Sequence, residues 1–233
     1  MTWRMTVHPE QRLRRRVRQD SGVTAARDRQ RRVVGIVGPP GAGKSTLAAG
    51  LVAEHPDTHV VLPMDGFHLA QRELSRLGRS QRKGAPDTFD VDGYVSLLAR
   101  VRSQPNRSVY APRFDRHIEE PIANAIAIEP RHTTVITEGN YLLHNDGGWE
   151  RVRPLLDECW YVDCEYPARI VRLIVRHIEH GRTGPQAAAW VHDVDEPNAR
   201  LVRTARETAD VIISSDDGRL AFPLPPDWRT PWW

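Results

Sequence analysis

The chain has 233 residues, of which 39% are hydrophobic and 27% charged, and its formal net charge is +3. This composition is typical of a globular domain that buries a core, and it excludes a chain that is disordered throughout. The sequence has no apolar run of about 18 residues, no signal-peptide pattern and only two cysteines, Cys159 and Cys164. We therefore expect a cytoplasmic protein without a disulfide framework and without a membrane partner.

Basic residues are unevenly distributed. Residues 1–32 hold ten arginines against three acids and form a predicted basic arm, whereas the rest of the chain has an acidic balance. The arm is either a solvated extension or a segment that touches nucleic acid, and the body does not predict nucleic-acid binding. Of the 33 basic residues 31 are Arg, so Lys44 and Lys83 are expected where a compact ammonium is required.

Short β-branched clusters alternate with helical patterns between residues 33 and 216. Strands are predicted at 33–37, 60–62, 134–137, 160–162 and 211–213, and helices at 46–54, 92–102, 149–156, 167–180 and 185–194. This alternation is typical of an α/β fold with a parallel sheet flanked by helices. The Pro- and Trp-rich residues 217–233 form a predicted tail, either packed irregularly on the body or serving as a Pro-rich ligand.

The strongest motif follows the first predicted strand of this domain. Residues 38–45 read GPPGAGKS, which fits G-x-x-x-x-G-K-[ST] between a strand and a helix. In such a phosphate loop, backbone N–H groups surround phosphate oxygens, the Lys reaches the outer phosphates and the Ser hydroxyl holds Mg²⁺. The predicted nucleotide-binding residues here are Gly38, Pro39, Pro40, Gly41, Ala42, Gly43, Lys44, Ser45 and Thr46.

Two acids follow later strands. Asp65 comes after the second strand, at the sheet edge where open α/β folds bind ligands, and is predicted to accept the proton of an attacking hydroxyl or to help hold Mg²⁺. The alternative for Asp65 is a helix N-cap. Glu138 follows the strand at 134–137, and we expect it to coordinate Mg²⁺ together with Ser45.

Two segments between these acids combine aromatic and charged residues. Residues 83–90, KGAPDTFD, are called the acceptor loop below, and residues 109–116 read VYAPRFDR. Both are predicted to bind a small polar acceptor, and a plain hairpin with exposed charges is the alternative for both. The candidate acceptor-binding residues in and around them are Phe67, His68, Lys83, Asp87, Phe89, Tyr110, Arg113 and Asp115.

The predicted helix at 167–180 carries arginines at helical spacing. Arg169, Arg172 and Arg176 share one face, Arg182 follows the helix, and the stripe of Ile170, Val171, Ile174, Val175 and Ile178 is expected to be buried. These arginines are predicted to close over ATP as a helical lid, with a solvated arginine face as the alternative.

In chain order, the strings GPPGAGKST, PMDGFH, KGAPDTFD, VYAPRFD, VITEGNYLL, RHIEHGRT and EPNARLV resemble the phosphoribulokinase/uridine kinase family of P-loop small-molecule kinases. Within it, the chain is most similar to a bacterial nucleoside/nucleotide kinase branch related to bacterial pantothenate kinase. The resemblance covers roughly residues 32 to 214.

The resemblance implies ATP as donor, Mg²⁺, and transfer of the γ-phosphoryl group to a hydroxyl of a nucleoside, a pantothenate-like compound or a sugar. It implies Asp65 as base, Glu138 near the metal, Arg172, Arg176 and Arg182 on the lid side, and Asn198 close to nucleotide or acceptor. A homodimer is frequent among such kinases. The alternatives are an ATP-binding regulator that uses the basic arm on nucleic acid, and a motor or chaperone ATPase.

Overall fold

The central sheet has six strands. The computed structural model describes residues 3–7 and 30–215. Its sheet order is β1-β8-β7-β2-β6-β3, and the strands are β1 (Trp3–Val7), β2 (Arg32–Val37), β3 (His59–Pro63), β6 (Thr134–Gly139), β7 (Glu158–Asp163) and β8 (Val211–Ser215). Strands β3, β6, β2, β7 and β8 run parallel, and β1 pairs antiparallel with β8 at one edge. The predicted α/β fold with a parallel sheet is confirmed.

The central strands are apolar along their length because both faces of the sheet are covered. In β2 every residue after Arg32 is buried, as in parallel strands packed between two layers of helices. In the register, Pro63 of β3 pairs with Glu138 of β6, and Val37 of β2 pairs with Gly139. The carboxyl ends of β2, β3 and β6 therefore meet at one level of the same sheet edge.

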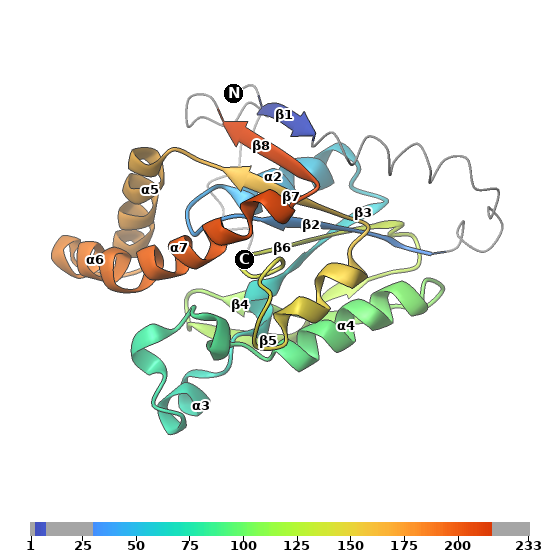
Figure 1. The fold of residues 1–233 in the computed structure, drawn as a ribbon. Coiled ribbons are helices and arrows are strands. Elements are labelled where there is room, and N and C mark those ends of the chain that lie inside the picture. Colours follow the sequence, from blue (N-terminus) through green and yellow to red (C-terminus); the bar gives the residue numbers. More distant parts are fainter. Residues whose placement is uncertain (1–2, 8–29, 216–233) are drawn as a thin grey trace.

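Helices lie on both faces and beyond the carboxyl ends of the strands (Figure 1). The helices are α2 (Lys44–Glu54), α3 (Gln71–Arg76), α4 (Val91–Ser103), α5 (Tyr166–Glu179), α6 (Gly184–Trp190) and α7 (Glu196–Thr204). A π-helical turn, Val191–Asp195, joins α6 to α7. A separate antiparallel hairpin consists of β4 (Val109–Asp115) and β5 (Glu120–Ile128). Figure 1 shows α5, α6 and α7 gathered at the end of the sheet to which the parallel strands point.

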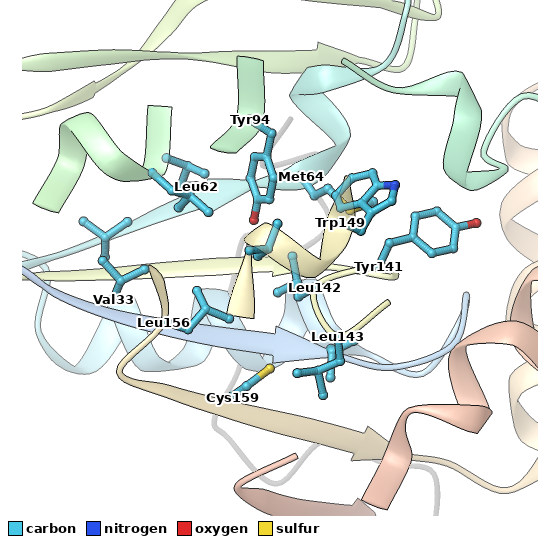
Figure 2. Packing of buried hydrophobic residues seen from close by; sticks show 14 of the residues in the cluster. Val33, Leu62, Met64, Tyr94, Tyr141, Leu142, Leu143, Trp149, Leu156 and Cys159 are labelled. Carbon is cyan, nitrogen blue, oxygen red and sulfur yellow. The ribbon is translucent and has the colours of Figure 1, made fainter. Parts of the chain in front are cut away.

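Two apolar clusters hold the layers together. The larger one joins the sheet to α4, to the turns around Trp149 and to α7, and Figure 2 shows Leu62, Tyr94 and Trp149 among its side chains. The smaller one packs Leu47 and Ala48 of α2 against the opposite face of the sheet. The phosphate loop thus starts from a strand that is fixed on both faces.

The predicted strands are confirmed, and one predicted helix is wrong. Residues 149–156 form two short 3₁₀ turns, Trp149–Arg151 and Arg153–Leu155, in place of a helix. Pro154 explains the difference, since it lacks an N–H donor and disfavours the α conformation of the residue before it.

The buried face predicted for α5 is also wrong. Val171, Val175 and Ile178 of the expected apolar stripe are 61%, 47% and 46% exposed. The buried residues of the helix are Arg169, Leu173 and His177. Both polar members of that face have partners, because Arg169 pairs with Glu196 and donates to the Pro40 carbonyl, and His177 Nε2 lies 2.7 Å from an Asp195 carboxylate oxygen.

Most of the predicted basic arm and the predicted tail, residues 8–29 and 216–233, lies outside the described residues. Within the predicted arm, Trp3–Val7 forms strand β1. No helix among residues 3–7 and 30–215 is both long and apolar enough to cross a bilayer.

Candidate active site

The phosphate loop makes a tight turn between β2 and α2. Gly41 has φ of 79°, and a Cβ there would lie 2.8 Å from the Leu173 side chain, so the position requires glycine. Helix α2 starts at Lys44 behind Gly43, without a side-chain cap. Its first N–H groups therefore have no acceptor within the helix, and they form an anion-binding end directly after the glycines.

Lys44 extends across the loop. Its ammonium donates to Asn140 Oδ1 at 2.7 Å and to the Pro39 carbonyl at 3.2 Å. Burial lowers the pKa of Lys44 to about 8, although the nearby carboxylates of Glu138 and Asp65 act in the opposite direction. An arriving polyphosphate would supply the negative charge that a buried ammonium lacks.

Ser45 and Glu138 form the candidate metal site. Ser45 Oγ donates to Glu138 Oε1 at 3.0 Å, so a hydroxyl and a carboxylate meet beside the first turn of α2. Burial, together with the charge of Asp65, raises the pKa of Glu138. Hydroxyl and carboxylate oxygens suit Mg²⁺, which takes oxygen ligands and usually keeps several waters. A bound cation would also favour the ionised form of Glu138.

Asp65 lies in a 3₁₀ turn, Met64–Phe67, directly after β3. Asp65 is not a helix N-cap, since the N-cap position of this turn is Pro63. Its carboxylate pairs instead with the Arg116 guanidinium at 2.9 Å. Burial acts to raise the pKa of Asp65, but the electrostatic interactions with His68, Arg116 and Lys44 outweigh it and hold the pKa below its ordinary value. Asp65 is therefore an ionised carboxylate facing the same space as Lys44.

An aromatic wall lies next to Asp65. The His68 ring packs against Phe89 and Phe114 at centroid distances of 4.1 and 4.7 Å, and His68 Nδ1 lies 2.7 Å from the Asp65 carbonyl. The Lys83 ammonium lies 5.0 Å from the Phe114 ring centroid. His68 is thus brought close to Asp65, and Phe89 and Lys83, also predicted from the sequence, are brought close to the aromatic rings beside it.

Of the predicted lid arginines, Arg176 is nearest to this group. Its pKa is lowered by burial first and by Arg116 second, and Asp65 and Glu138 act on it in the opposite sense. Arg172 lies farther along, with Nη1 3.4 Å from Cys164 Sγ. Arg182 is held inside the lid, since its guanidinium lies 4.2 Å from the Trp190 ring centroid and 2.9 Å from His177 Nδ1.

Other predicted site residues have different surroundings. Tyr110 is 53% exposed near the start of β4, and Phe67 is buried in the core. Asp87 is paired with Arg79 and Arg82. Asp115 accepts the backbone N–H of His117 in the hairpin turn, at 2.9 Å. A role of these four residues in acceptor binding stays a prediction.

The acceptor loop is held from behind by polar contacts. Asn198 Nδ2 donates to the Gly84 carbonyl at 3.4 Å, and the Tyr141 hydroxyl donates to the same carbonyl.

Phe89 and Asp87 also line a cavity of about 600 Å³, which includes neither Asp65 nor a residue of the phosphate loop. Arg113 has a buried Nε without a hydrogen-bond partner among the described residues.

Two residues of the site were not predicted from the sequence. Arg116 follows β4 directly and pairs with Asp65, and Asn140 follows β6 and accepts from Lys44. Asn140 could have been found, because it comes two residues after Glu138 at the end of the same predicted strand. Arg116 gives no such signal, since its reach to Asp65 depends on how the hairpin docks.

The chain is similar in sequence to known kinases. No family model matches the chain. A candidate uridine kinase of Schizosaccharomyces pombe is 34% identical over 202 residues, which cover 82% of this chain and 86% of that protein. A uridine kinase of Clostridium perfringens is 31% identical over 184 residues, which cover 77% of this chain and 85% of that protein.

A solved structure is similar over almost its whole length. It is that of a candidate fructose transport system kinase from Silicibacter sp. TM1040, with a TM-score of 0.72, 34% identity, and coverage of 88% of this chain and 98% of that one. The chain therefore belongs to the phosphoribulokinase/uridine kinase family of P-loop kinases.

Proposed function

We propose that this member of the phosphoribulokinase/uridine kinase family transfers the γ-phosphoryl group of ATP to a hydroxyl of a small molecule, with Asp65 as the proton acceptor. The main support for a phosphoryl transfer is the position of three groups at one edge of the sheet. The phosphate loop, the Asp65 carboxylate and the Ser45–Glu138 pair occupy the carboxyl ends of β2, β3 and β6, whose register aligns them at one edge. Donor, metal and acceptor groups of a phosphoryl transfer would meet there.

The donor side follows from the loop and the lid. Backbone N–H groups at the start of α2 bind phosphate oxygens, and Lys44 exchanges its bond to Asn140 for one to the outer phosphates. Arg176 is a second cation for the transferred group. Within the described part of the chain its guanidinium has no hydrogen bond, and it lies close enough to Asp65 and Glu138 to affect their charge balance.

The acceptor side depends on Asp65. Its ionised carboxylate accepts the proton from the acceptor hydroxyl as that oxygen attacks phosphorus, and the bond between phosphorus and the bridging oxygen of ADP breaks. The low pKa of Asp65 makes it a weak base at rest, which suits a loose transition state in which the proton leaves late.

Ser45 and Glu138 fit a Mg²⁺ ion. The Ser45 hydroxyl and the Glu138 carboxylate, 3.0 Å apart, would hold it directly or through water. When bound, Mg²⁺ supplies positive charge to the phosphate oxygens. The raised pKa of Glu138 supports this assignment, because burial and the charge of Asp65 outweigh the stabilising effect of Lys44 and Ser45 on the ionised form.

A screen of alcohol metabolites tests the proposal. The protein is incubated with ATP, Mg²⁺ and single nucleosides, sugars, sugar phosphates or hydroxy acids, and ADP release is measured. We expect at least one compound to stimulate ADP release at least tenfold, and Lys44→Ala to abolish the stimulation. ADP release that is independent of every acceptor would overturn the proposal in favour of an ATPase.

A further inference from the structure

Cations from three segments gather near Asp65 and the neighbouring Phe114. Arg116 comes from the β4–β5 hairpin, Lys83 from the acceptor loop and Arg176 from α5. Arg116 and Lys83 lie against the same ring, with the guanidinium carbon 5.8 Å and the ammonium nitrogen 5.0 Å from the Phe114 centroid. Segments far apart in the sequence thus place positive charge around one buried aromatic side chain.

Lys83 packs against the aromatic wall formed by His68, Phe89 and Phe114. It is one of only two lysines in the chain, and its side chain is 11% exposed. It donates to the Glu119 carbonyl at 2.6 Å, while the Glu119 carboxylate lies 3.6 Å away, beyond ordinary hydrogen-bond distance. An ammonium has three N–H donors, so Lys83 can bind an additional acceptor oxygen.

The positive charges repel one another here. Burial is the largest cause that lowers the pKa of Arg176, and the charge of Arg116 is the second largest. The pKa of His180, the residue after α5, is lowered by the same two causes in the same order. The acids facing the group are Asp195, Asp65, Glu138 and the half-exposed Glu119. Arg116 donates to Oδ2 of Asp65, so Oδ1 can accept the proton of the acceptor hydroxyl while this pair is kept.

We propose that the acceptor is itself an anion, and that Arg116 and Lys83 bind its carboxylate or phosphate group beside Phe114 while its hydroxyl lies against Asp65. This inference rests on the proposed kinase function and narrows its substrate class. A guanidinium binds carboxylate or phosphate through two parallel hydrogen bonds, which fixes the acceptor's orientation as well as its charge. The acceptor's anionic group would then be an additional partner of Arg116 beside Asp65.

Binding of matched probes tests the inference. The full chain is saturated with Mg²⁺ and a non-hydrolysable ATP analogue and titrated by calorimetry with gluconate against glucose, and with ribose 5-phosphate and glycerol 3-phosphate against ribose and glycerol. We expect the anionic member of at least one pair to bind at least tenfold more tightly than its neutral partner. The gluconate pair reports on carboxylates, and the other two pairs report on phosphates.

Variants separate this role from a structural one. Arg116→Gln and Lys83→Met should each reduce the preference for the anionic probe at least tenfold, and Arg116→Lys should keep part of this preference. Arg131→Gln removes an exposed cation paired with Glu129 and should leave the preference unchanged. Thermal melts confirm that each variant is folded, and Lys83→Gln, which also removes the charge, replaces Lys83→Met if the latter unfolds.

Two results would overturn the inference. One is equal binding of anionic and neutral members in every pair, and the other is an anion preference that Arg116→Gln leaves unchanged. The kinase function is tested separately. Phosphorylation of a neutral compound such as uridine would support the kinase function and would refute the inference that the acceptor is an anion. Failure of the ATP analogue to bind would count against the kinase itself.

Discussion

Arg116 donates to the Asp65 carboxylate at 2.9 Å and so joins the β4–β5 hairpin to the end of β3, 51 residues earlier in the chain. This pair gives the site its asymmetry. Asp65 lies close to Lys44 of the phosphate loop and also to His68, whose ring packs against Phe114. The carboxylate is therefore near groups assigned to the nucleotide and near groups assigned to the acceptor.

The first prediction concerns Asp65. Asp65→Asn removes the proton acceptor and should lower the acceptor-stimulated turnover rate by about 10²- to 10⁴-fold. Affinity for the ATP analogue should change little, because the phosphate loop is intact. Asp92→Asn, which changes an exposed acid paired with Arg151, is the matched control. Steady-state kinetics and calorimetry check both parts, and wild-type turnover in Asp65→Asn would refute the assignment.

The second prediction concerns the metal site. Glu138→Gln and Ser45→Ala each remove an oxygen partner of the predicted Mg²⁺ ion, and each should raise the Mg²⁺ concentration for half-maximal turnover at least tenfold. The measurement is ADP release as a function of free Mg²⁺ at saturating ATP. An unchanged Mg²⁺ dependence in both variants would exclude these residues from metal binding.

The third prediction is a pH dependence of stability. The pKa of Lys44 in the nucleotide-free protein is about 8, below its ordinary value of 10.5, so the unfolded chain binds this proton more tightly. The contribution of Lys44 to stability should therefore rise with pH between about 8 and 10.5, by up to about 3 kcal/mol. Urea unfolding of wild type and Lys44→Met at pH 8 and pH 10 isolates it. A difference between the two proteins that does not change with pH would contradict the prediction.

The fourth prediction concerns the buried ion pair behind the phosphate loop. Arg169 is 1% exposed, pairs with Glu196 of α7 and donates to the Pro40 carbonyl. Arg169→Met leaves the buried Glu196 carboxylate with the more distant Arg203, 3.8 Å away, and should lower the free energy of unfolding by about 3–5 kcal/mol.

The double variant Arg169→Met with Glu196→Leu provides the control for this pair. It removes both charges and should recover most of the loss. Urea denaturation measures both proteins. If the single variant is as stable as wild type, Arg169 does not link the loop to the lid.

The fifth prediction tests which face of α5 is buried. Leu173→Ala should lower the free energy of unfolding by about 2–5 kcal/mol, because Leu173 is fully buried. Val171→Lys, on the exposed stripe, should change it by less than about 0.5 kcal/mol. If Val171→Lys destabilised the protein more than Leu173→Ala in thermal or urea unfolding, the apolar stripe would be buried as expected from the sequence.

The fold and the donor side of the site could be predicted because their signals are local. A glycine-rich turn between a strand and a helix defines the phosphate loop within eight residues. Asp65 and Glu138 each follow a strand directly, and parallel strands bring their carboxyl ends to one edge. Neither inference requires knowledge of how distant segments dock.

The acceptor side and the lid could be predicted only in part, because they depend on long-range contacts. The period of α5 correctly identifies an amphipathic helix, but Arg169 and His177 face inward because Glu196 and Asp195 of the following helices pair with them. Arg116 and Asp65 likewise meet only once the hairpin is in place. Tyr110 shows the opposite case, since its aromatic character suggested binding while its strand leaves it exposed.

Transfer of isotopically labelled γ-phosphate from ATP is the most direct test of the account. The protein is incubated with γ-¹⁸O-labelled ATP, Mg²⁺ and a defined mixture of hydroxyl metabolites, and the products are analysed by mass spectrometry. The account predicts label on an organic phosphate ester in the wild type and its loss in Asp65→Asn. Label found solely in inorganic phosphate, or equal ester formation by Asp65→Asn, would contradict it.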